Sequence, residues 1–230
     1  MASPGASLKS TLRKSVLGAY RARGKSINNL WLVYSVKTDS DWILPSDRQL
    51  IHWLYFLEAT PEVSWFDLAP EPVLSHDGKE QRATELDAIV TLRDGQTEWH
   101  EVKSGHSKRD PLHESQMLAQ ANAASAKHIV YKRLNDTDLK PKVKVALRWN
   151  RAISYAAAIR GEAHHPSQTA IVLAMKDLHQ GTIQQLLAKL DDHDPMIVLG
   201  ILVRLSINGI VRLDLEKTFF GLQTSWTYHE

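Results

Sequence analysis

The sequence predicts an α/β protein in which a mixed sheet is flanked by helices and followed by a smaller domain of helices and two strands. Two observations support this fold class. Strand-like and helix-like apolar segments alternate along the first part of the chain, and beyond about residue 150 helical patterns follow one another before two final strands. With 43% hydrophobic and 23% charged residues in 230, the chain has the composition of an ordinary globular protein.

Residues 1–29 precede any predicted strand and form a basic, partly flexible arm that contains no acidic residue. Such an arm suits a phosphate backbone, because each neutralised phosphate releases condensed counterions. The alternative is a solvated leader that binds nothing. The candidate DNA-binding residues of the arm are Lys9, Arg13, Lys14, Arg21, Arg23 and Lys25.

Residues 30–148 form the first predicted domain. A strand is expected at 30–36, where β-branched and aromatic residues dominate. A helical pattern follows, which Ser46 or Asp47 can cap and which Pro61 ends. The remaining pattern consists of an extended segment at 64–76, a hairpin at 85–105, a helix at 111–129, a short strand at 128–133 and a basic connector at 140–144.

Residues 149–230 form the second predicted domain. Helices are expected at 149–161, 181–190 and 195–209, and two strands around a turn near Gly221 finish the chain. Helices followed by a two-stranded wing indicate a winged helix-turn-helix module. The helix at 195–209 is so apolar that we expect it to be buried, which leaves Arg204, Arg212 and Lys217 for DNA or partner contacts. We expect an exposed loop around His164-His165.

The turn of the hairpin at 85–105 decides where its charged side chains lie. A two-residue loop would direct Asp87 towards the core face. A three-residue loop, with Gly95 in the left-handed conformation, instead places Asp87 directly across from Glu101, and Leu86 across from Val102. We therefore predict the three-residue loop.

Two opposed carboxylates repel each other in a sheet, and a bound cation removes the repulsion. We predict Asp87 and Glu101 as ligands of Mg²⁺ or Mn²⁺, which prefer oxygen donors and keep several waters. Lys103 lies on the face of Glu101, where it would stabilise the charge that develops on a phosphate, so metal-assisted hydrolysis of a phosphodiester follows. The alternative is an ordinary exposed strand, on which Glu-x-Lys pairs are common.

Composition excludes several other classes. The absence of cysteine excludes disulfides and thiolate metal sites and favours hard cations held by Asp, Glu or the eleven His. No apolar run reaches the roughly 20 residues that cross a bilayer, and the N-terminus lacks the apolar core of a secretory signal. We therefore expect a cytoplasmic protein without a membrane partner. The net charge of +2 does not by itself mark a nucleic-acid binder.

The order of Asp87, a hairpin, and then Glu101 and Lys103 resembles the PD-(D/E)xK nuclease superfamily. Within it, the chain resembles the TnsA-type endonuclease subunit of heteromeric transposases. Five segments, spread from about residue 30 to 220, carry this resemblance: YSVKTDSDW, FLEATPEVSWFDLAPEP, ELDAIV, HEVKSG and LVRLSINGIVRLDLEKTFFG. The superfamily motif alone is short and degenerate, whereas the ordered set is more specific.

The resemblance implies a restriction-endonuclease-like domain followed by a winged-helix-like domain. It also implies a metal-dependent DNA endonuclease, in a bacterial cytoplasm, that cleaves at the 5′ ends of a transposon. The implied partners are double-stranded DNA at the transposon ends, a DDE transposase (TnsB-like) that joins the 3′ ends, and an AAA+ ATPase regulator (TnsC-like). Two alternatives stay open: a nuclease-like DNA-binding or scaffolding subunit that cuts weakly or not at all, and a restriction- or repair-type endonuclease.

One position departs from the resemblance. Members of the family place a further catalytic Glu near the start of the first helix, where this chain has Gln49. We expect Gln49 to occupy that place, either coordinating through its carbonyl oxygen or holding a water, with less charge for a second metal. Glu58 cannot replace it, because a nine-residue step of an α-helix turns by about 900° and leaves the two side chains on opposite sides.

Overall fold

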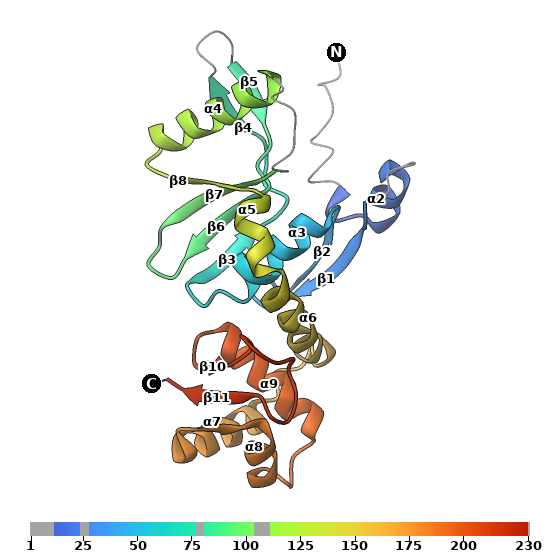
Figure 1. The fold of residues 1–230 in the computed structure, drawn as a ribbon, viewed down its shortest axis with the longest axis vertical. Helices are drawn as coiled ribbons and strands as arrows, with labels where there is room; N and C mark the ends of the chain where they lie inside the picture. The colour runs from blue at the N-terminus through green and yellow to red at the C-terminus, as the bar shows by residue number, and fades with distance from the viewer. Residues whose placement is uncertain (1–11, 24–27, 77–80, 104–110, 230) are drawn as a thin grey trace. The chain divides into compact units, whose positions relative to one another are not determined.

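The structure is a computed structural model that describes residues 12–23, 28–76, 81–103 and 111–229 (Figure 1). The chain divides into two compact units. The first unit comprises Met1–Trp53 and Val63–Pro141, and the second comprises Leu54–Glu62 and Lys142–Glu230. The domain boundary predicted between residues 148 and 149 falls inside helix α6, Val143–Ala158.

A four-stranded sheet with the order β3-β6-β7-β8 forms the centre of the first unit. Strands β3 (Val63–Asp67), β6 (Ala88–Leu92) and β7 (Thr97–Val102) are antiparallel neighbours, whereas β8 (Val130–Leu134) runs parallel to β7. A parallel pair needs a long crossover, and helix α4 (Pro111–Ala126) lies in it (Figure 1). The sheet is therefore mixed, as predicted.

Helical segments contact both faces of this sheet. On one face, Trp99 of β7 packs in a buried cluster with Ala124 of α4. The next residue, His100, points to the opposite face because side chains alternate along a strand. There its ring meets the ring of His52. The predicted layers of sheet and helix are thus confirmed for the first unit.

Two small hairpins accompany the main sheet. Strand β1 (Trp31–Ser35) is the strand predicted at 30–36, and it pairs with β2 (Ser40–Leu44), which the sequence did not predict. The segment predicted as extended contains β3 and, further on, β4 (Val73–His76), which pairs with β5 (Gln81–Thr84). The basic arm also includes a short helix, α2 (Val16–Arg23).

The first predicted long helix changes type in the middle. Helix α3 (Asp47–Ile51) is capped by Ser46, whose side chain accepts a hydrogen bond from the Gln49 N–H. Residues His52–Glu58 continue as a π-helix, and the Ala59 N–H bonds the carbonyl of Leu54. The predicted α-helical spacing between Gln49 and Glu58 is therefore wrong, because a π-helix winds more loosely. After the sheet, α5 (Asp136–Leu139) and a 3₁₀ turn (Lys140–Lys142) end the first unit.

The second unit is mainly helical. Its helices are α6, α7 (His165–Leu178), α8 (Ile183–Lys189) and α9 (Pro195–Ile207). Its antiparallel sheet has the order β10-β11-β9, from Val211–Leu213, Ser225–Tyr228 and Gln180–Thr182. The two final strands were predicted, whereas α7 and β9 were not. The exposed loop predicted around His164-His165 is confirmed up to His164, whereas His165, also exposed, begins α7.

Helix α9 supplies much of the apolar core of the second unit, as its sequence predicted. It ends at Asn208, and Gly209 follows with a positive φ of 76°. Arg204, predicted for DNA or partner contacts, makes hydrogen bonds within the second unit. Its guanidinium donates to the carbonyls of Ile159 at 2.6 Å and Glu162 at 3.1 Å, and so stabilises the chain beyond the end of α6.

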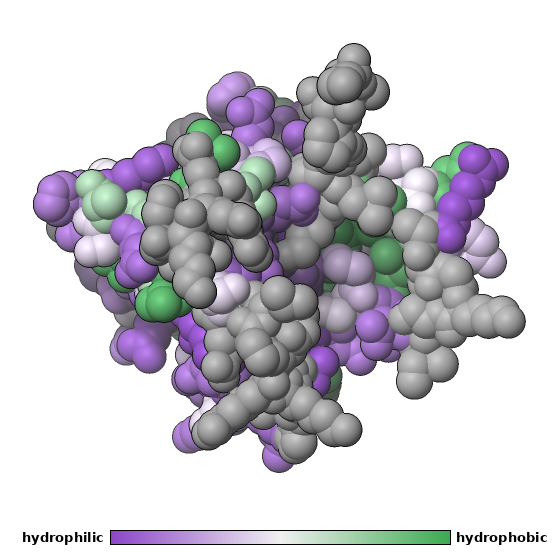
Figure 2. All heavy atoms as spheres, turned by 90° about the horizontal axis from the view of Figure 1, so that it is seen from above, coloured by the Kyte–Doolittle hydropathy of each residue, from purple (hydrophilic) through white to green (hydrophobic). Residues whose placement is uncertain are grey.

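The surface mixes hydrophilic and hydrophobic residues. Figure 2 shows a face on which hydrophilic residues predominate and smaller hydrophobic areas lie among them. Several large apolar side chains are exposed, including Val16, Leu17 and Tyr20 of α2. Within the described ranges, no helix combines the length and apolarity needed to span a bilayer.

Candidate active site

The hairpin of β6 and β7 closes with the predicted three-residue loop. Gly95 has a φ of +87°, a conformation that glycine adopts without steric cost. The Leu92 N–H donates to the carbonyl of Gln96 at 2.8 Å, and the Gly95 N–H donates to the carbonyl of Leu92 at 3.0 Å. The resulting register pairs Ala88 with His100. The predicted loop and the register that follows from it are confirmed over β6.

The paired ladder of β6 and β7 ends at Ala88, the residue next to Asp87. The Asp87 N–H donates to the carbonyl of His100, at 3.1 Å, although His100 already faces Ala88. This two-against-one arrangement is a β-bulge, and it shifts the alternation of faces. Leu86 consequently packs in one cluster with Trp99, on the face opposite to Ala88. The predicted direct pairs of Asp87 with Glu101 and of Leu86 with Val102 do not form in the ladder.

At the bulge, the Asp87 carboxylate accepts hydrogen bonds from three separate segments of the chain. Its Oδ2 accepts the Val102 N–H of β7 at 2.8 Å, in place of a backbone carbonyl. Its Oδ1 accepts Gln49 Nε2 at 3.2 Å and Arg13 Nη2 at 3.0 Å. Because the side chain is only 4% exposed, these bonds hold it in one orientation. Asp87 therefore remains next to the end of β7 even though the ladder has ended.

Helix α3 brings Gln49 to the site, as predicted. The N-cap at Ser46 fixes the start of the helix, and Arg48 anchors it to α5 through bonds of 2.6 and 3.0 Å to the Asp136 carboxylate. This pair raises the pKa of Arg48 through the hydrogen bond with Asp136. Gln49 Oε1 is buried and has no hydrogen-bond partner among the described residues. An acceptor of this kind fits a metal ion or an ordered water.

Glu101 of β7 and Lys103, which directly follows the strand, lie together as predicted from their spacing. The Glu101 side chain is completely buried, and its Oε1 lies 2.6 Å from Lys103 Nζ. The Lys103 side chain is 22% exposed, so its ammonium group reaches from the buried carboxylate towards solvent. The Lys103 N–H donates to the carbonyl of Leu134 at 2.9 Å, which extends the pairing with β8 and fixes this end of the strand.

The donor set suits a hard divalent cation. Two buried carboxylates, from Asp87 and Glu101, and the amide oxygen of Gln49 are the oxygen ligands that Mg²⁺ and Mn²⁺ prefer. Over the described ranges, no group of three or more His, Cys, Asp or Glu side chains is arranged to hold a metal ion. A metal at this place would thus depend on two carboxylates, one amide and waters.

The described basic residues of the arm lie in different surroundings. Arg13 is buried against Asp87, so it is not free to contact a phosphate backbone here. Lys14 and Arg21 are exposed, and the Lys14 ammonium lies 5.7 Å from the centre of the Trp42 ring. The predicted positions Lys9 and Lys25, and the side chain of Arg23, lie outside the described part of the chain.

A chain of buried polar groups beside the site was not predicted. His52 Nε2 lies 2.9 Å from His100 Nδ1, and His100 Nε2 lies 2.9 Å from Glu98 Oε2. Glu98 Oε1 lies 2.7 Å from the half-exposed Lys132 ammonium, where the chain reaches solvent. Glu98 and His100 face the apolar Val90 and Ala88 across the hairpin. Polar residues on a core face were the signal in the sequence that would have indicated such a network.

Burial sets the charge of His52, and hydrogen bonding sets the charge of Glu98. It lowers the pKa of His52 well below its usual range, and the neighbouring His100 and Arg13 lower it further. The hydrogen bond from His100 lowers the pKa of Glu98, and Lys132 acts in the same direction against the effect of burial. His52 is therefore neutral at pH 7, whereas Glu98 is a carboxylate.

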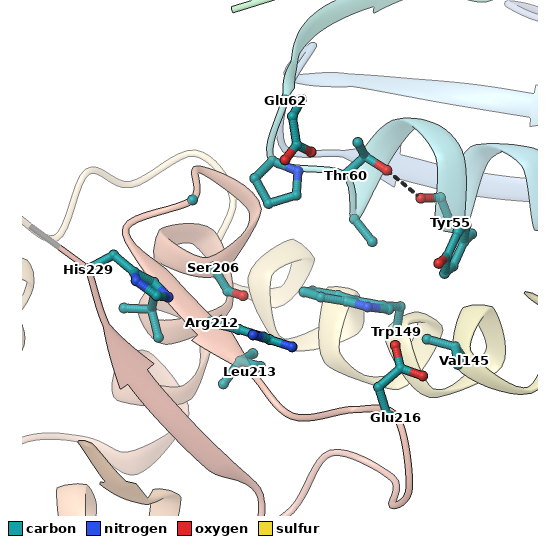
Figure 3. Close-up of a pocket in the computed structure, with 14 residues that line it drawn as sticks. Tyr55, Thr60, Glu62, Val145, Trp149, Ser206, Arg212, Leu213, Glu216 and His229 are labelled. Atoms are coloured by element: carbon teal, nitrogen blue, oxygen red, sulfur yellow. Dashed lines mark hydrogen bonds between the residues drawn. The ribbon is translucent and has the colours of Figure 1, made fainter. Parts of the chain in front are cut away.

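A cavity of about 490 Å³ lies within the second unit (Figure 3). Figure 3 shows Trp149 of α6 and Arg212 of β10 at its wall, with the carboxylates of Glu62 and Glu216 at its rim. None of the four predicted catalytic residues lines this cavity. All four belong to the first unit.

Comparisons with known proteins do not name a family. No protein-family model matches the chain, and no curated protein matches its sequence. What the chain does is thus argued from the geometry around Asp87, Glu101 and Lys103.

Proposed function

We propose that the chain is a metal-dependent DNA endonuclease that hydrolyses a phosphodiester bond next to Asp87, Glu101 and Lys103. One observation carries the proposal. The buried Glu101 carboxylate lies 2.6 Å from the Lys103 ammonium at the end of β7, and a second buried carboxylate, that of Asp87, accepts a hydrogen bond from Val102 at the same end. Burying a carboxylate costs free energy, so such groups are found where they are paired or belong to a functional site. The lysine also extends towards solvent, where a substrate phosphate would approach.

Each residue has a separate role in the proposed reaction. Asp87 and Glu101 would hold a divalent cation, which would polarise the phosphate and make a bound water more acidic. The Val102 N–H orients the Asp87 carboxylate. Lys103 donates to the phosphate oxygen on which negative charge develops. The unpartnered Oε1 of Gln49 accepts a hydrogen bond from the attacking water or binds the cation.

The resemblance to TnsA-type subunits extends this proposal to cleavage at the 5′ ends of a transposon. In that setting the partners are double-stranded DNA, a DDE transposase and an AAA+ ATPase. The order of elements in the second unit supports a winged-helix-like module there: α8 and α9 are followed by β10 and β11, and β9 pairs with β11. Exposed Arg212 and Lys217 are the groups of this module that would contact DNA or a partner.

The test is cleavage of a supercoiled plasmid that carries transposon ends, with the partner transposase and Mg²⁺ or Mn²⁺. We expect Glu101→Gln and Lys103→Ala each to reduce the cleavage rate by a factor of about 100 or more, because each removes a charge that acts on the transition state. Glu71→Gln is the matched control, since Glu71 is an exposed carboxylate remote from the hairpin in sequence. It should cleave at the wild-type rate.

Circular dichroism and thermal unfolding confirm that each variant is folded. Wild-type cleavage rates in the folded Glu101→Gln or Lys103→Ala protein would rule out this catalytic site. A wild-type protein that binds transposon ends but does not cut them with either metal would instead support the scaffolding alternative.

A further inference from the structure

Arg13 is buried beside Asp87, whereas a DNA-binding role would require it to be exposed. Its guanidinium donates through Nη1 to the backbone carbonyl of Asp87 at 2.7 Å and through Nη2 to Asp87 Oδ1 at 3.0 Å. The residue is only 3% exposed. The guanidinium therefore holds both the backbone and the carboxylate of Asp87.

Several carboxylates act on this guanidinium. Burial lowers the pKa of Arg13, and four nearby carboxylates oppose the shift; they are Asp87, Glu101, Asp67 and Glu85. An arginine nevertheless stays charged at any pH a protein tolerates. The guanidinium is therefore a permanent cation near Asp87 and Glu101, the two carboxylates proposed to bind the metal.

Each carboxylate of the proposed metal site is paired with a cation in this arrangement. Asp87 and Glu101 bring two negative charges, and Arg13 and Lys103 bring two positive charges. A divalent cation that enters such a site meets a positive group already bonded to Asp87 Oδ1. Withdrawal of Arg13 would make the site more negative and remove the positive group from Asp87 Oδ1, which would keep its hydrogen bond from Gln49 Nε2.

We propose that Arg13 is a resident cation of the site and competes with the divalent metal for Asp87. The inference rests on the proposed function and adds its regulation: metal affinity depends on where the arm lies. The described segment around Arg13 is also held at its backbone and at the next residue. The Ile43 N–H donates to the carbonyl of Arg13 at 3.0 Å, and the next residue, Lys14, stacks over Trp42. Displacing this segment opens the site to metal.

Mn²⁺ binding to the full chain without DNA tests the competition. We expect Arg13→Ala to bind Mn²⁺ at least about tenfold more tightly than wild type by isothermal titration, since a charge next to a carboxylate alters its affinity for cations by such factors. Arg21→Ala is the matched control, because it removes the same charge from an exposed residue of the arm. It should change the affinity less than about threefold.

Thermal unfolding provides a second readout. Removing Arg13 leaves a buried carboxylate without its guanidinium, so the metal-free variant should unfold at a lower temperature than wild type. Mn²⁺ should raise the unfolding temperature of Arg13→Ala more than that of wild type. If Arg13→Ala does not fold without metal, Arg13→Gln removes the charge and retains an amide donor.

Two outcomes separate the inference from the proposed function. Equal Mn²⁺ affinity in wild type and Arg13→Ala, abolished in both by Asp87→Asn, would overturn the competition and leave the metal site intact. No Mn²⁺ binding that depends on Asp87, in either protein, would overturn the metal site and the competition together.

Discussion

At the scale of single residues, Asp87 has the most consequential surroundings. Its partners are 74, 38 and 15 positions away in the sequence, at Arg13, Gln49 and Val102. Only the nearest of these follows from hairpin register. The two distant partners depend on how the arm and α3 pack against the sheet, which no local pattern encodes.

His52 and Glu98 make the stability of the first unit depend on pH. The pKa of His52 is lowered in the folded protein, so between its usual pKa, near 6.5, and the lowered value the unfolded chain binds the extra proton. The pKa of Glu98 is lowered as well, so its contribution is present above about 4.5 and lost as the pH falls through its folded pKa. Both groups therefore favour unfolding in acid.

Urea unfolding between pH 7.5 and 5 measures this dependence. We expect the free energy of unfolding of wild type to fall below about pH 6.5, by up to about 1.4 kcal/mol per pH unit for one proton. His52→Leu removes the titrating group and should flatten the slope. Ile51→Val, a buried neighbour without a titrating group, should lower stability at every pH and keep the slope. A wild-type slope in His52→Leu would contradict the assignment to His52.

At the scale of elements, the hairpin and the first helix illustrate two different limits. The β6–β7 loop could be predicted because Gly95 adopts a conformation that other residues avoid. The π-helix at His52–Glu58 could not, because its residues have an ordinary helical pattern and the loose winding is decided by packing around them. The bulge at Asp87 belongs to the second kind.

Helices α6 and α9 approach closely at Gly200. A Cβ added there would lie 2.7 Å from Ile159 Cδ1 and 2.8 Å from the carbonyl oxygen of Tyr155. We expect Gly200→Ala to reduce the free energy of unfolding by about 1–3 kcal/mol, because overpacking outweighs the gain of about 1 kcal/mol in helix propensity.

Gly221→Ala is the control for this substitution, because an added Cβ there meets its nearest atom at 3.9 Å. It should change stability by less than about 0.5 kcal/mol in the same thermal or urea unfolding experiment. Equal stability of Gly200→Ala and wild type would show that the two helices can separate at this point without loss.

At the scale of the whole molecule, the second unit is assembled from two separate parts of the sequence. Leu54–Glu62 belongs to it together with Lys142–Glu230. Pro61 lies against Gly209, where an added Cβ would be 3.1 Å from the proline Cβ. Leu54 and Leu57 are fully buried. A short helical segment from the first half of the chain thus belongs to the core of the second unit.

Hydrogen exchange tests this assignment. Leu57→Ala should cost about 2–5 kcal/mol, and exchange should accelerate mainly in α6 and α9. Leu86→Ala, a buried leucine of the cluster around Trp99, is the matched control and should accelerate exchange in β6, β7 and α4. If Leu57→Ala loosened only the strands of the first unit, Leu54–Glu62 would have to be assigned to that unit.

The sequence by itself determined the strongly patterned features: the mixed sheet, the hairpin loop, the buried α9, and the common face of Glu101 and Lys103. These depend on periodicity and on glycine, which act over a few residues. Tertiary structure alone decided the bulge at Asp87, the π-helix, the buried His52–His100 pair and the position of Arg13. Each of these features depends on groups that are far apart in the sequence and lose their contact with water only when the chain packs.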